Sequence, residues 1–154
     1  MNKFKLPKII GHRGLKDYAP ENTFSGIKKA ISSGFKFIEV DVKITKDLIP
    51  VLLHDETINR TSDGFGKCID FTYYELKKFD FGNWFSANYK NEKILTLQDA
   101  LKYVSKNHIG INIELKPNKG KEIENIDAIE KIIKLYYNNL KLYISSFDIL
   151  SLEY

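Results

Sequence analysis

Apolar residues along the chain recur at two different spacings, and these alternate from one end to the other. Short apolar or alternating segments predict strands, and segments whose apolar residues recur every three or four positions predict helices. A short strand, expected to close a hairpin, covers 49–53, and the strands expected to be joined by crossovers cover 8–11, 37–43, 109–114 and 141–146. This alternation predicts an α/β fold with parallel strands joined by helical crossovers.

Helices are predicted between these strands. Thr23 is a suitable N-cap for the first helix, which is expected to stop near Gly34. Thr96 begins the second helix, with an acidic residue three positions later in the spacing of a capping box. The third helix is predicted over 121–138, and 147–154 has the pattern of the first turns of another. The chain therefore reads as repeated βα units.

Residues 55–95 interrupt this regular pattern. They contain a polar loop at 61–66 and a group of aromatic residues that is expected to form a cluster: Phe79, Phe81, Trp84 and Phe85. We interpret 55–95 as an insertion on the main scaffold. Because the chain has neither internal repeats nor a Gly/Ser-rich linker, residues 1–154 are expected to form a single domain.

Composition excludes several classes of protein. The 154 residues are 43% hydrophobic and 29% charged, which is typical of a globular domain. The 24 basic and 20 acidic residues interleave, so the net charge of +4 favours anionic substrates slightly and does not predict a nucleic-acid partner. A single cysteine, Cys68, excludes an internal disulfide. No apolar run approaches the roughly 20 residues of a transmembrane segment, and without a secretory signal a cytoplasmic location is expected.

Candidate metal ligands lie on two predicted strands. Glu39 and Asp41 share one face of their strand because side chains alternate, and Glu114 has the same place in the strand at 109–114. The pattern alone describes a solvent-facing surface, but in a βα fold helices cover the apolar faces and leave the carboxylates inside. Buried carboxylates require a cation or a partner. An all-oxygen set suits a divalent cation, Mg²⁺ or Ca²⁺.

Two histidines directly follow apolar strands, where parallel α/β folds place their sites. They are His12 and His54. Imidazoles titrate near neutral pH and are suitable proton donors and acceptors for phosphodiester cleavage. The remaining histidine, His108, is interpreted as a capping or surface residue. The pair of histidines together with three carboxylates indicates a catalytic site.

Eight short motifs, taken in order, resemble those of the glycerophosphodiester phosphodiesterases. The resemblance runs from residue 8 to about 147, and 55–95 is similar to an insertion that this family carries within its barrel. The motifs are Gly11-His12-Arg13-Gly14, Pro20-Glu21-Asn22-Thr23, Glu39-Val40-Asp41-Val42, Thr45-Lys46-Asp47, His54-Asp55, Arg60-Thr61, Leu95-Thr96-Leu97 and Glu114-Leu115-Lys116.

The resemblance implies a (β/α)8 TIM barrel that hydrolyses glycerophosphodiesters to glycerol 3-phosphate and an alcohol. Its small-molecule substrates would include glycerophosphocholine and glycerophosphoethanolamine. The resemblance implies that a divalent cation is bound by Glu39, Asp41 and Glu114, and that His12 and His54 act as general acid and base in either order. It further implies that Arg13 and Lys116 bind the phosphate and that Glu21 orders the first loop.

Length sets the chain apart from a complete barrel, which typically needs about 250 residues. The predicted strands account for the first four βα units, so we expect an incomplete, C-terminally truncated barrel. Such a half barrel has unpaired edges and exposed apolar surface. These features predict either a homodimer that completes the barrel or a missing C-terminal half.

Other functions remain open at this stage. A truncated, non-catalytic remnant would bind a metal or a partner without turnover. A phospholipase D-like lyase acting on lysophospholipid or sphingomyelin would use the same residue types, since those toxins resemble the family in their paired histidines and E-x-D carboxylates. The toxins are secreted and disulfide-bonded, whereas this chain has one cysteine, so the lyase is the weaker alternative.

Overall fold

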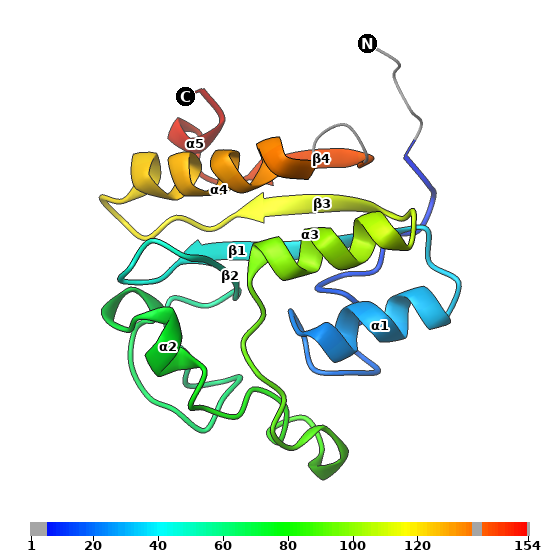
Figure 1. Cartoon of the computed structure of the whole chain (residues 1–154), viewed down its shortest axis with the longest axis horizontal. Coiled ribbons are helices and arrows are strands. Elements are labelled where there is room, and N and C mark those ends of the chain that lie inside the picture. Colours follow the sequence, from blue (N-terminus) through cyan, green and yellow to red (C-terminus); the bar gives the residue numbers. More distant parts are fainter. Residues whose placement is uncertain (1–5, 137–139, 154) are drawn as a thin grey trace.

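The structure is a computed structural model that describes residues 6–136 and 140–153. Its sheet has four strands in the order β2-β1-β3-β4 (Figure 1). The strand β1 (Phe37–Ile44) pairs in parallel with β3 (Gly110–Leu115), which pairs in parallel with β4 (Leu142–Ser146). The short β2 (Pro50–Leu52) runs antiparallel to β1. The predicted α/β fold is confirmed, as an open sheet over the described residues and not a closed barrel.

The helices begin where the sequence predicted caps. Helix α1 (Phe24–Ser32) is capped by the Thr23 hydroxyl, which accepts a hydrogen bond from the amide of Gly26. Helix α3 (Leu97–Lys106) is capped in the same way by Thr96. The long α4 (Glu122–Tyr136) and the short α5 (Leu150–Glu153) complete the series. Within the described residues, no helix combines the length and the apolar character needed to cross a membrane.

The predicted first strand, residues 8–11, is wrong. This segment is not a strand: it bends at Lys8 and makes a single bridge, between Gly11 and Ile38. The amide of Gly11 donates to the carbonyl of Phe37 at 3.0 Å, and the amide of Glu39 donates to the carbonyl of Gly11 at 2.7 Å. The chain turns immediately after Gly11, where an added Cβ would lie 2.3 Å from the carbonyl oxygen of Gly14. After this turn the amide of Gly14 donates to the carbonyl of Glu39 at 3.0 Å, but no regular ladder forms.

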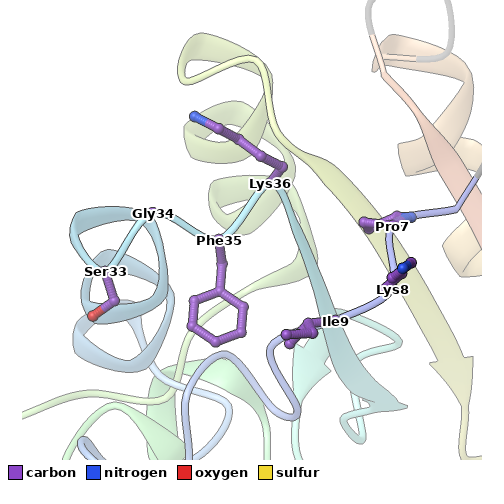
Figure 2. Close-up of a pocket in the computed structure, with 7 residues that line it drawn as sticks. All are labelled: Pro7, Lys8, Ile9, Ser33, Gly34, Phe35 and Lys36. Carbon is purple, nitrogen blue, oxygen red and sulfur yellow. The ribbon is translucent and has the colours of Figure 1, made fainter.

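The segment before Gly11 borders a shallow pocket of about 390 Å³ at the start of β1. Figure 2 shows the side chains of Ile9 and Phe35 facing each other across it. Ile9 is 69% exposed, which agrees with a segment that lies beside the sheet without joining it. This pocket shares no lining residue with the candidate site described below.

The main core lies between one face of the sheet and the helices. On β1, Val40 and Val42 are fully buried, and on β3 Ile111 and Ile113 are fully buried. These side chains belong to one cluster with residues of α1, α3 and α4. Because side chains alternate along a strand, the other face of β1 and β3 carries the polar residues. The register places Asp41 opposite Glu114 and Glu39 opposite Asn112.

The segment between β2 and α3 has a small core of its own. It contains the short helix α2 (Tyr73–Leu76) and 3-10 turns at Cys68–Asp70 and Ala87–Tyr89. The small core consists of Val51 of β2 together with Leu53, Ile58, Cys68, Leu76, Phe81 and Ile94 of this segment. Figure 1 shows this segment extending away from the sheet beside α1.

The aromatic residues of this segment pack in two places. The ring of Phe79 meets Phe71, with centroids 5.7 Å apart, beside the small core. The ring of Trp84 meets Phe85 at 5.7 Å, and Phe85 meets Tyr89 at 5.6 Å. The expected single aromatic cluster is therefore divided by the turn at residues 82–83, where Asp80 accepts hydrogen bonds from both amides.

Candidate functional site

Three carboxylates meet on the polar face of the sheet. Glu39 and Asp41 come from β1 and Glu114 from β3, and one oxygen of each lies within 4.8 Å of the others. The parallel pairing of β1 with β3 produces this arrangement, since it sets Asp41 beside Glu114. Glu39 Oε1 is buried and has no hydrogen-bond partner among the described residues. An unpartnered buried oxygen within an all-carboxylate set fits a hard divalent cation.

Burial makes the charge on Glu39 costly. Loss of hydration, followed by the negative charge of Asp41, raises the pKa of Glu39 to about 7. A hydrogen bond from the backbone amide of Arg13 to Glu39 Oε2, 2.9 Å long, acts in the opposite direction but is outweighed. In the absence of a cation, this site therefore holds a proton on Glu39 at neutral pH more readily than an ordinary carboxyl does.

Asp41 is held in place by residues of the first loop. It is 1% exposed, and its Oδ2 accepts a hydrogen bond from Asn22 Nδ2 at 2.8 Å. The Asp41 amide donates to Asn22 Oδ1 at 3.1 Å, and Arg13 Nε lies 3.4 Å from Asp41 Oδ2. Arg13 and Asn22 both have positive φ, 51° and 55°. Sequence reasoning missed Asn22, although an asparagine tolerates this left-handed conformation.

Lys116, directly after β3, contacts two of the same carboxylates. Lys116 Nζ lies 2.6 Å from Glu114 Oε1 and 3.8 Å from Asp41 Oδ1. It also lies 5.3 Å from the ring centre of Phe147. Lys43, which sequence reasoning did not single out, is 5% exposed and donates to the Lys116 carbonyl at 3.0 Å. Burial lowers the pKa of Lys43.

The two predicted histidines have different surroundings. His12 Nε2 lies 3.8 Å from Glu39 Oε2 with the His12 side chain half-exposed, so it borders the carboxylate cluster. Burial, followed by the charge of Arg13, lowers the pKa of His12. His54 follows β2, and its Nδ1 lies 2.7 Å from Asp55 Oδ1. His108 is exposed just after α3 with a φ of 55°, as the capping or surface interpretation requires.

Glu21 links the first loop to the loop that follows β2. Its Oε1 accepts hydrogen bonds from Arg13 Nη1 and Arg60 Nη2, both 2.8 Å long, and its Oε2 accepts one from Arg60 Nη1 at 2.8 Å. Burial raises the pKa of Glu21, but the hydrogen bonds from Arg60 and Arg13 outweigh it and leave that pKa below its usual value. Glu21 therefore remains ionised between two arginines.

All eight predicted site residues lie in this region. The three carboxylates form one cluster, which is flanked by His12, Arg13 and Lys116. His54 is connected to this cluster through a chain of contacts that runs over Asp55, Arg60 and Glu21. Asp55 and Arg60 belong to two of the sequence motifs, but the sequence pattern did not predict a role for either residue.

Comparison with known proteins places this fold among phosphodiesterases. The structure of an Oleispira antarctica phosphodiesterase in complex with the product sn-glycerol-3-phosphate aligns with a TM-score of 0.94 and 40% identity, over 96% of this chain and 60% of that one. A glycerophosphodiester phosphodiesterase from Thermotoga maritima aligns with a TM-score of 0.75 and 33% identity, over 97% of this chain and 58% of that one. The described sheet thus matches part of a phosphodiesterase fold.

Sequence relatives identify the family. A glycerophosphodiester phosphodiesterase from Caldanaerobacter subterraneus subsp. tengcongensis is 38% identical over 94% of this chain and 60% of its own length. Human glycerophosphodiester phosphodiesterase 1 is 33% identical over 84% of this chain and 40% of its own length. Residues 12–154 match the glycerophosphoryl diester phosphodiesterase family, and the chain belongs to that family. It spans about half the length of these relatives.

Proposed function

We propose that the chain carries the metal-binding and acid–base half of a glycerophosphodiester phosphodiesterase, which hydrolyses glycerophosphodiesters to glycerol 3-phosphate and an alcohol. The observation that carries the proposal is the meeting of Glu39, Asp41 and Glu114 on adjacent parallel strands, next to His12 and Arg13. The neighbour from Oleispira antarctica, which holds sn-glycerol-3-phosphate, supports the substrate class.

In this proposal the three carboxylates hold Mg²⁺ or Ca²⁺. When bound, such a cation supplies a Lewis acid for a phosphoryl oxygen and lowers the pKa of an attacking hydroxyl. The carboxylates would orient it, and the Arg13 guanidinium and Lys116 ammonium would bind phosphate oxygens. Arg13 Nε and Lys116 Nζ already lie beside Asp41, 3.4 Å and 3.8 Å from its carboxylate oxygens. Arginine and lysine suit this task because phosphate is anionic.

His12 and His54 would divide the proton transfers between them. One removes the proton from the attacking hydroxyl, and the other delivers a proton to the leaving alcohol. The lowered pKa of His12 keeps its imidazole neutral at neutral pH and able to accept a proton. The 2.7 Å contact with Asp55 gives His54 a fixed orientation, which a positioned acid or base requires.

We also propose that the sheet is part of a (β/α)8 barrel, with residues 55–95 as an insertion in a single domain. The match over 96% of this chain but 60% of the Oleispira antarctica protein supports this arrangement. Among the described strands, β4 pairs with β3 alone, and Ile144 of β4 is 46% exposed. Further strands, from a second copy of the chain or from a C-terminal half, would pair with β4.

The test is release of glycerol 3-phosphate from glycerophosphocholine by the purified chain, measured with Mg²⁺, with Ca²⁺ and with EDTA. The mass of the chain in solution is measured in the same experiment, because a dimer would complete the sheet. Metal-dependent turnover supports the proposal. Metal binding without turnover favours the non-catalytic alternative, and a cyclic phosphate product favours the lyase.

Variants separate metal binding from proton transfer. Glu39→Ala and Asp41→Ala should abolish divalent-cation binding in a calorimetric titration, because each removes a carboxylate ligand. His54→Ala should retain metal binding and lose turnover. His108→Ala is the matched control, since this exposed histidine lies outside the site. Unchanged titration by Asp41→Ala would refute the ligand assignment, and full activity of His54→Ala would refute its role.

A further inference from the structure

Arg60 occupies a junction between the two sides of the candidate site. It lies in the loop after β2, with its side chain 43% exposed. Its Nε and Nη2 donate to Asp55 Oδ2 and Oδ1 at 2.7 Å and 3.1 Å. Its Nη1 and Nη2 donate to Glu21 Oε2 and Oε1, both at 2.8 Å. One planar guanidinium therefore binds two carboxylates, each through two hydrogen bonds.

Each carboxylate in turn contacts a residue of the proposed chemistry. Asp55 Oδ1 lies 2.7 Å from His54 Nδ1, and an ionised carboxylate only accepts hydrogen bonds. The His54 ring therefore carries a proton on Nδ1, which in the neutral ring leaves Nε2 as an acceptor. Glu21 Oε1 binds Arg13 Nη1 at 2.8 Å, next to the metal carboxylates. The hydrogen bonds from Arg60 also hold the pKa of Asp55 near 2.

We propose that Arg60 is a positioning residue that fixes the His54–Asp55 pair and the Glu21–Arg13 pair relative to each other. The inference deepens the proposed function and rests on it, because His54 and Arg13 matter for catalysis only if the site cleaves a phosphodiester. Arg60 acts through the two carboxylates and holds the acid–base side of the site against the phosphate-binding side.

The geometry requires an arginine. Four of its five N–H groups are engaged, at angles set by the planar fork. A lysine at this position would keep the positive charge but concentrate it on one ammonium, which cannot bind two carboxylates in the same bidentate manner. Exposed ion pairs usually contribute little. Here the doubly bidentate arrangement gives orientation, which a single exposed pair does not.

The test compares Arg60→Lys with a matched control. Lys67→Gln removes an exposed ion pair from the same segment, in which Lys67 Nζ lies 3.0 Å from Glu56 Oε1, and leaves the site untouched. The first readout is the ¹⁵N NMR spectrum of the imidazole nitrogens at about pH 8 in EDTA. The chain has three histidines, so His54→Gln assigns the signal.

The wild type and Lys67→Gln should show His54 with its proton on Nδ1. Arg60→Lys should shift His54 toward the Nε2–H form that free imidazole prefers. The second readout is turnover of glycerophosphocholine, in which we expect kcat to fall about 10- to 100-fold, by analogy with the loss of a partner that orients a metal-ligating histidine. Mg²⁺ affinity measured by calorimetry should stay unchanged.

A double-mutant cycle identifies the route of the effect. If Arg60 acts on His54 through Asp55, Asp55→Asn should shift the His54 tautomer in the same direction. The double variant should then be no worse than either single variant. Should Arg60→Lys fail to fold, as judged by circular dichroism, Asp55→Asn carries the test because it disrupts the same contact from the other side.

Two results would overturn the inference: a wild-type His54 with its proton on Nε2, or an Arg60→Lys variant that keeps both the Nδ1–H form and a kcat within twofold of the wild type. Failure of the proposed function looks different. A wild-type chain without turnover, but with the expected tautomer and its loss in Arg60→Lys, retains the positioning role and removes the phosphodiesterase proposal.

Discussion

Glu39→Gln tests the electrostatic description of the site most directly, because it removes the charge and keeps the shape. The pKa of Glu39 stands near 7 in the folded chain against a usual value of 4.5. The folded chain therefore binds this proton more tightly than the unfolded chain does. The stability contributed by this group is largest below about pH 4.5, falls as the pH rises through about 7, and changes little above that.

The magnitude follows from the same two values. Each tenfold difference in proton affinity is worth about 1.4 kcal/mol. At about pH 8, keeping Glu39 ionised costs the folded chain about 3 kcal/mol. Glutamine carries no charge, and its carbonyl oxygen still accepts the hydrogen bond from the Arg13 amide. We expect metal-free Glu39→Gln to be about 3 kcal/mol more stable than the wild type, about 6–12 °C in Tm for a chain of this size.

The assay is thermal unfolding followed by circular dichroism, in EDTA and in Mg²⁺, at about pH 8 and about pH 4. The variant should exceed the wild type in EDTA at pH 8, match it at pH 4, and gain nothing from Mg²⁺. Glu130→Gln is the control, since Glu130 is an exposed carboxylate that pairs with Lys134 on α4. A variant no more stable than the wild type at pH 8, or equally stabilised by Mg²⁺, would refute the reasoning.

Three further expectations concern the scaffold. Leu101→Ala should cost about 2–5 kcal/mol in urea unfolding, because Leu101 is fully buried in the main core; a loss below 1 kcal/mol would contradict that packing. Burial raises the pKa of Cys68 to about 12. At about pH 8 a thiol reagent should therefore modify Cys68 only as fast as the chain opens. Rapid labelling of the native chain would contradict the burial of this thiol. Gly14→Ala should destabilise the chain more than Gly34→Ala in the same urea assay. Both glycines have positive φ, but a Cβ at Gly14 would lie 2.7 Å from the backbone carbon of Gly26, whereas one at Gly34 has open space. Equal losses of stability would exclude the steric contribution.

The parts of the fold that sequence predicted well depend on local rules. Val40 and Val42 alternate with Glu39 and Asp41, and strand geometry alone assigns the two sets to opposite faces. Thr23 caps α1 through an amide three residues away. The segment 8–11 failed for the opposite reason. Its composition suits a strand, but the chain bends at Lys8 and turns after Gly11, and it makes only one bridge to β1.

The candidate site was predictable to the extent that its residues follow strands. Glu114 and His54 were found because each has a recognisable place along or just after a strand. Arg60 and Asn22 were not, since their roles arise from contacts across 39 and 19 residues of sequence. A pattern read along the chain identifies residue types suited to chemistry, whereas hydrogen bonds between distant loops become visible only after folding.

The pairing of β1 with β3 ties the accuracy of the site to the accuracy of folding. Asp41 stands opposite Glu114 in the same ladder that sets Val40 opposite Ile113. A slip of one residue in β3 would turn its carboxylate into the helix layer and its isoleucines out of the core. Misregistered chains therefore lose core and ligands together. Over evolution, single-residue insertions or deletions within either strand should be purged as folding defects.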